Sequence, residues 1–280
     1  MTTISPNGDS PKPPVIVLDI PTILAIGIVV FIIKNIIHEG LGHGGACLLV
    51  GGKPLLLTTA HFDYDVHSVS DLGARIIAAG GFLANFIAAG IFFFLFRRAN
   101  PHSPRLRYFY WFSMSGNFFV GAGYPLFSGI LGLGDLIDVV QGYEPVWAWR
   151  MLLVVAGSVL YGVGVWWSLR EIATLIGAHP AERLKRAFML TLFPYLAAAT
   201  AASIGSLLNP LGVFVVFTSA SASFGGSSAF AWMSQLLKNS RWFPQQSEAY
   251  IQIERSWIWI IAALVLLAFH IIVLGPGLHF

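Results

Sequence analysis

Long apolar stretches separated by short polar loops run along most of the chain. A helix needs about 20 mostly apolar residues to cross a bilayer. By this criterion the sequence predicts six to seven membrane spans, the fifth and sixth being separated only by "NPLG" from Asn209. The predicted spans are residues 20–48, 73–96, 108–132, 147–169, 187–207, 211–236 and 256–275. The pattern therefore indicates an all-α polytopic membrane protein that lies in a lipid bilayer.

The composition supports this fold class. Of the 280 residues, 56% are hydrophobic and 10% are charged, whereas a soluble domain carries about 25% charged residues. The net charge of +3 is small and scattered, so no nucleic-acid partner is expected. Cys47 is the single cysteine, which excludes an internal disulfide and a metal site built from cysteines, and we interpret it as a packing residue. Residues 1–14 are polar and proline-rich and predict a disordered leader.

The loops also predict an orientation. Basic residues gather between spans two and three, four and five, and six and seven. They are Arg97, Arg98, Arg105, Arg107, Arg170, Arg183, Lys185, Arg186, Lys238, Arg241 and Arg255. Because positive loops stay on the cytoplasmic side, we expect the N-terminus in the cytoplasm and the C-terminus outside. The loop 53–71 is rich in Thr, Val and aromatic residues and predicts a short strand or β-hairpin beside the membrane.

Ionisable residues inside spans are costly and are functional-site hypotheses by default. Most of those found here belong to span one or to the end of span three, with one more in span seven. They are Lys34, His38, Glu39, His43, Asp135, Asp138 and His270. We interpret His270, which stands alone, as a packing residue. His38, Glu39 and His43 lie so close together that a bound cation is the simplest way to satisfy all three.

Zinc fits this cluster. Two neutral imidazoles and a carboxylate, with one position open, form a catalytic zinc site, and a neighbouring glutamate serves as the base. However, His38 and His43 are five residues apart, about 500° around a regular helix and hence roughly 140° off a shared face. Gly40 and Gly42 favour local unwinding, and a one-residue π-bulge restores the shared face. We therefore predict a π-bulge within "HEGLGH".

Three segments resemble the site-two protease family of intramembrane zinc metalloproteases. "HEGLGHGGACLLVGGKP" is similar to the family's zinc-binding motif and the Gly-Gly turn that follows it. "AAGGFLANFIAAG", residues 78–90, is similar to the family's Ala-Gly-Pro-x-Ala-Asn-Phe segment, and "LGLGDLIDVV" lies where the family's third ligand is an aspartate. The resemblance covers residues 22–140, about half of the chain.

The resemblance implies a three-helix metalloprotease-like core within residues 15–140. It implies that Zn²⁺ is held by His38, His43 and an aspartate of span three, with Glu39 as the catalytic base. We favour Asp135 as the third ligand and keep Asp138 as the alternative, because Leu136 follows Asp135 where the family usually has Gly. The resemblance also places Asn85 at the active site, where its amide is expected to bind the substrate backbone or the developing oxyanion.

The leading hypothesis is a zinc-dependent intramembrane endopeptidase that cuts a transmembrane or juxtamembrane segment of a membrane-anchored protein. One alternative is a transporter or ion-binding protein that uses the same His, Glu and Asp residues, although no internal repeat of the transporter type is visible. Another is an inactive protease-like scaffold. A second metal site at Asp63, Asp65 and His67 is less favoured than an ordinary solvated loop. Residues 141–280 are expected to add further transmembrane helices, with no role or oligomeric state indicated.

Overall fold

The computed structural model describes residues 17–177, 180–238 and 250–280. The predicted leader, residues 1–14, and Arg241 lie outside the described residues. The first half of the chain forms α1 (Ile20–Ile36), the π-helix η1 (Ile37–Gly44), α2 (Gly45–Leu49), β1 (Pro54–Leu57), β2 (Phe62–Tyr64), the 3-10 helix η2 (Val66–Ser68), α3 (Asp71–Arg98), α4 (Pro104–Leu131) and α5 (Asp135–Val140). The second half forms α6 (Val146–Ile172), α7 (Pro180–Ser206), α8 (Gly212–Ser227), α9 (Ala229–Trp232), the 3-10 helix η3 (Met233–Lys238), α10 (Trp257–Phe269), the π-helix η4 (His270–Leu274) and β3 (Leu278–His279).

Within the described residues, 5 helical segments are long and apolar enough to cross a membrane. They are Ile20–Leu49, Asp71–Arg98, Val146–Ile172, Glu182–Ser206 and Trp257–Leu274. These segments correspond to the first, second, fourth, fifth and seventh predicted spans, and they indicate a helical, multi-pass membrane protein. The predicted sixth span is shorter than expected, because α8 ends at Ser227 after 16 residues and continues as short helical pieces.

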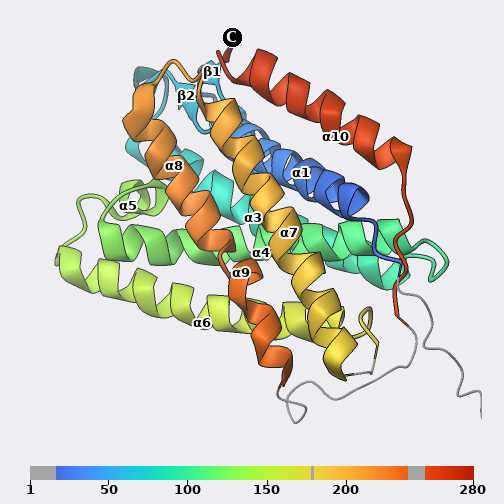
Figure 1. The fold of residues 1–280 in the computed structure, drawn as a ribbon. Helices are drawn as coiled ribbons and strands as arrows, with labels where there is room; N and C mark the ends of the chain where they lie inside the picture. The colour runs from blue at the N-terminus through green and yellow to red at the C-terminus, as the bar shows by residue number, and fades with distance from the viewer. Residues whose placement is uncertain (1–16, 178–179, 239–249) are drawn as a thin grey trace, which may run out of the picture.

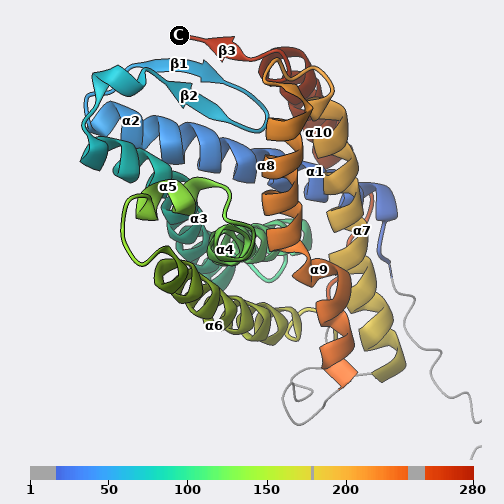
Figure 2. The ribbon, with the colours of Figure 1, turned by 90° about the vertical axis from the view of Figure 1, so that its left-hand side faces the viewer.

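The predicted third span forms α4, a helix of 28 residues that is not among the apolar candidates. Figure 2 shows α4 nearly end-on, surrounded by α3, α6, α8 and the short α5. Most of its residues are buried, including Ser113, Ser115 and Asn117. Because α4 contacts protein on most sides, polar residues on it need not face lipid. Such a central helix does not have to meet the hydropathy of a lipid-facing one.

Loops that are far apart in the sequence meet at one end of the bundle, on the right-hand side of Figure 1. The end of α3, the start of α4, the end of α6 and the segments before α1 and α10 are joined there by ion pairs. These pairs are Arg97–Glu171 at 3.5 Å, Arg105–Glu254 at 3.5 Å and Arg255–Asp19 at 3.0 Å. Several of the basic residues singled out in the sequence therefore lie at a common end of the molecule.

A small antiparallel sheet lies at the other end, above α1 and α2 (Figure 2). Strands β1 and β2 form the hairpin predicted for the loop 53–71, with Leu57 opposite Phe62. Strand β3, at the end of the chain, pairs with the other edge of β1 and gives the order β2-β1-β3. This third strand was not predicted, because two residues carry too little alternation to be recognised.

Candidate metal centre

The segment "HEGLGH" lies in the π-helix η1, which confirms the predicted π-bulge. The N–H of Gly45 donates to the carbonyl of Gly40, five residues earlier, so residues five apart lie on successive turns. As a result, the two imidazoles point the same way, and His38 Nε2 lies 3.3 Å from His43 Nε2.

Glycines bring α3 directly against this turn. A Cβ added to Gly42 would lie 2.6 Å from the Cα of Gly81, and one added to Gly80 would lie 2.4 Å from the carbonyl oxygen of Gly42. A Cβ on Gly81 would lie 2.4 Å from His43 Nε2 and 2.7 Å from His38 Nε2. The "GG" of α3 therefore leaves the space in which the two histidine rings meet.

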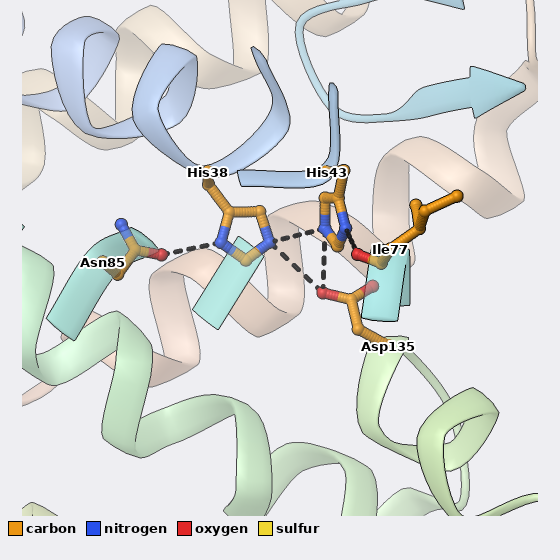
Figure 3. A network of polar contacts seen from close by, with 5 residues as sticks. All are labelled: His38, His43, Ile77, Asn85 and Asp135. Atoms are coloured by element: carbon orange, nitrogen blue, oxygen red, sulfur yellow. Dashed lines mark hydrogen bonds and ion pairs between the residues drawn. The ribbon is translucent and has the colours of Figure 1, made fainter. Parts of the chain in front are cut away.

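Asp135 reaches the histidines from the far end of α4. Gly132 and Gly134 adopt positive φ angles of 70° and 85°, which glycine tolerates best, and they turn the chain from α4 into α5. Asp135 is the first residue of α5, and its Oδ2 lies 3.2 Å from His38 Nε2 and 3.3 Å from His43 Nε2 (Figure 3). Asp138, one turn further, borders the same cavity but is not part of this cluster.

The three side-chain atoms fit a zinc ion. In a tetrahedral site with bonds of about 2.0–2.1 Å, neighbouring ligand atoms are about 3.3–3.4 Å apart. The distances among His38 Nε2, His43 Nε2 and Asp135 Oδ2 are 3.2–3.3 Å. Two imidazoles and a carboxylate are also a donor set that zinc prefers, and a tetrahedral ion held by three residues keeps one position open. The arrangement can therefore hold a metal ion with one coordination position left open.

Hydrogen bonds behind the ligands set the imidazole tautomers. The carbonyl of Ser113 accepts from Asn117 Nδ2 at 2.8 Å, so Asn117 Oδ1 accepts from Asn85 Nδ2, also at 2.8 Å. Asn85 Oδ1 is then left to accept from His38 Nδ1 at 2.6 Å. A carbonyl can only accept, so His43 Nδ1 likewise donates to the Ile77 carbonyl at 2.7 Å. Both histidines therefore present a Nε2 lone pair toward the metal position, as a ligand must.

The position of Asn85 differs from the one expected. The residue is 0% exposed, and its amide contacts His38 on one side and Asn117 on the other. It lies within the predicted site, but behind a ligand rather than beside the cavity. The "AAGGFLANF" pattern indicated its proximity to the site, whereas the direction of the amide depends on a partner from α4, which the pattern does not contain.

A cavity of about 470 Å³ opens beside the cluster. Its lining includes Glu39, His43 and Asp135 together with Phe62 and Tyr64 of β2, so the hairpin forms one wall. Glu39 is 5% exposed, borders this cavity and is not one of the three clustered ligands.

Tyr124 is a cavity residue that the sequence interpretation missed. Its ring stacks on His38 with centroids 4.5 Å apart and an interplanar angle of 29°. It borders the main cavity and also a smaller one behind it. A tyrosine eleven residues before Asp135 on the same predicted span was the available signal, but a single aromatic residue in a membrane helix does not stand out.

The other candidates have ordinary surroundings. Asp63 accepts a hydrogen bond from the backbone N–H of Tyr64, and Asp65 accepts one from the backbone N–H of His67, as in a solvated turn. Neither belongs to the cluster of potential metal ligands found among the described residues. Burial and the charge of Asp135 raise the pKa of Asp138. Cys47 packs with the apolar residues under the sheet.

Comparison with known proteins gives no match, either to a family model, to a curated protein or to a solved structure. The resemblance to site-two proteases thus rests on the three quoted motifs. The case for the site rests on the geometry of His38, His43 and Asp135 and on the groups around them.

Proposed function

We propose that this protein is a zinc-dependent intramembrane endopeptidase. The observation that carries the proposal is the triangle of His38, His43 and Asp135 beside Glu39, at the edge of a cavity in a chain of apolar helices. Structural zinc sites are closed by four protein ligands, whereas hydrolytic sites use three and keep an adjacent glutamate. With three candidate ligands and Glu39 beside them, the site has the composition of a hydrolytic zinc site.

In this proposal His38, His43 and Asp135 hold the zinc ion. When bound, zinc polarises the scissile carbonyl and makes a water molecule acidic enough to attack at neutral pH. Glu39 takes the proton of the attacking water and returns it to the leaving amine. Its buried position at the cavity edge supports this role, because a base must lie within hydrogen-bonding reach of the proton that it moves.

The geometry supports different roles for Asn85 and Tyr124. Asn85 is a positioning residue, since its oxygen holds the His38 ring by Nδ1. Tyr124 borders the cavity while its ring lies against His38, so its hydroxyl is the donor that we assign to the substrate carbonyl oxygen as negative charge develops there. This assignment replaces the oxyanion role expected of Asn85.

The distribution of charge supports an orientation. If the end that carries Arg97, Arg105 and Arg255 faces the cytoplasm, the sheet and the metal site at the opposite end lie toward the outer surface. A substrate is then a transmembrane or juxtamembrane segment of a membrane-anchored protein that is cut near that surface. The same orientation leaves the N-terminus inside and the C-terminus outside.

The experiment replaces Glu39 in cells that lack the native gene. Membrane-anchored proteins are profiled by mass spectrometry in cells complemented with wild type, Glu39→Gln or Glu144→Gln, the last carrying the same change in an exposed loop. We expect cleaved products with wild type and Glu144→Gln and none with Glu39→Gln, although all three chains accumulate equally. Equal cleavage by Glu39→Gln would contradict the mechanism. Ion flux without any cleaved product would instead favour the transporter alternative.

A further inference from the structure

Lys34 is a buried cation that the proposed mechanism does not use. It lies on α1, is 6% exposed, and its Nζ donates to Ser223 Oγ at 3.1 Å and to Ser227 Oγ at 3.2 Å. No carboxylate of the described residues lies within 4.0 Å of its Nζ. A charge buried away from water without a counter-charge is costly, so such a residue in a membrane protein is a functional-site hypothesis by default.

The two serines solvate the ammonium without neutralising it. Ser227 Oγ donates to the carbonyl of Ser223 at 2.6 Å, so its lone pairs are left for Lys34. An ammonium group has three N–H donors, and the serines take two of them. The only other group recorded against Nζ among the described residues is the Phe31 ring, whose centroid lies 5.4 Å away and which carries no net charge. One N–H donor of Lys34 is therefore left for an anionic group.

A small cavity connects Lys34 to the proposed catalytic residues. Its lining includes Lys34, His38, Glu39 and Tyr124, and it has room of about 20 Å³. Since one water-sized group needs about 10–15 Å³ of such space, the cavity suits the two oxygens of a carboxylate better than a large apolar side chain. Ser223 of α8 also lines this cavity, and Ser227 contacts Lys34 from the next turn of the same helix.

The spacing relates this cavity to the scissile bond. At about 1.5 Å per helical residue, Lys34 is about 6 Å along the axis from His38. An extended peptide advances about 3.3 Å per residue. If an extended substrate runs along α1 with its scissile carbonyl at the metal position, the side chain about two residues from that carbonyl lies at the level of Lys34.

We propose that Lys34, with Ser223 and Ser227, forms a carboxylate-binding subsite that selects substrates with an acidic group about two residues from the cleaved bond. This inference rests on the proposed endopeptidase function. The carboxylate belongs either to an internal Asp or Glu of the substrate or to its C-terminus. Both sources offer the same two oxygens to the ammonium group.

The test uses purified, zinc-loaded full-length protein and a peptide library made by digesting albumin and casein with trypsin. Cleavage sites are read by mass spectrometry for wild type, Lys34→Met and Lys53→Met, the last removing an exposed lysine outside the cavity. We expect wild type and Lys53→Met to favour Asp or Glu at one position within three residues of the cut. Lys34→Met should lose this preference, with kcat/KM for a Glu-bearing peptide falling at least about tenfold relative to its Gln counterpart. If the cuts instead lie at a constant distance from the C-terminus of each peptide, and C-terminal amidation abolishes them, the group bound by Lys34 is the terminal carboxylate.

A second measurement does not depend on the folding of Lys34→Met. The Glu39→Gln protein is titrated with the Glu-bearing and Gln-bearing forms of one selected peptide, and the Glu form should bind at least about tenfold more tightly. Equal affinities, or an acidic preference that survives in Lys34→Met, would overturn the subsite while leaving the protease proposal intact. Absence of any hydrolysis by zinc-loaded wild type would overturn both.

Discussion

Replacing Asn85 by Ala should weaken zinc binding, although Asn85 is not a ligand. The change removes the 2.6 Å hydrogen bond to His38 Nδ1 and leaves that N–H and Asn117 Oδ1 buried without partners. Losing the partner that orients a histidine ligand typically lowers metal affinity by about 10- to 100-fold. Each buried group left unpaired costs about 1–3 kcal/mol, so the free energy of unfolding should fall by about 2–6 kcal/mol.

The assay is competitive zinc titration of the detergent-purified protein against a chromophoric chelator, with helical content followed in the same samples. Asn85→Asp is the matched variant, because it keeps an acceptor for His38 and should hold zinc within about threefold of wild type. Asn117→Ala should have a smaller effect on zinc than Asn85→Ala, since it leaves the bond to His38 in place. Wild-type zinc affinity in folded Asn85→Ala, together with slow turnover, would refute the positioning role and restore direct contact with substrate.

Three further predictions test neighbouring parts of the site. Gly81→Ala places a methyl group among the histidine rings and should abolish zinc binding, whereas Gly90→Ala on the same helix meets nothing within 4 Å and should bind normally; zinc in both would be inconsistent with the close packing. Tyr124→Phe should keep zinc and peptide affinity but lower kcat about 100- to 1,000-fold, as loss of an oxyanion donor does, and an unchanged kcat would remove the hydroxyl from the mechanism. Asp135→Asn should lower zinc content, while Asp138→Asn should retain it, and the reverse pattern would show that the carboxylates were assigned wrongly.

Local spacing predicted the turn at the metal site. His38 and His43 are five positions apart with two glycines between them, a spacing that a regular helix does not place on one face, and the π-helix η1 places both on one face as predicted. The hairpin of the loop 53–71 was likewise a local pattern, carried by neighbouring residues in the chain. Properties of this kind can be read directly from a sequence.

Structural features that depend on residues distant in the sequence could not be predicted from the sequence. The apolar pattern predicted a span at residues 108–132 but did not show that α4 is surrounded by other helices, which lowers its need for apolar residues. The amide of Asn85 could not be oriented without Asn117, and β3 pairs with β1, a strand that is distant from it in the sequence. Lys34 stood out as an ionisable residue, but its partners Ser223 and Ser227 lie about 190 residues away in the sequence.

The most direct test of the account is the zinc content of protein purified without chelators, measured by elemental analysis for wild type and His43→Ala. The positions of His38, His43 and Asp135 predict about one zinc per chain in wild type, because their three ligand atoms lie at tetrahedral spacing around a single position. His43→Ala should retain only a small fraction of that zinc while the chain stays helical. Wild-type protein that takes up no zinc, or His43→Ala that holds as much as wild type, would contradict the account.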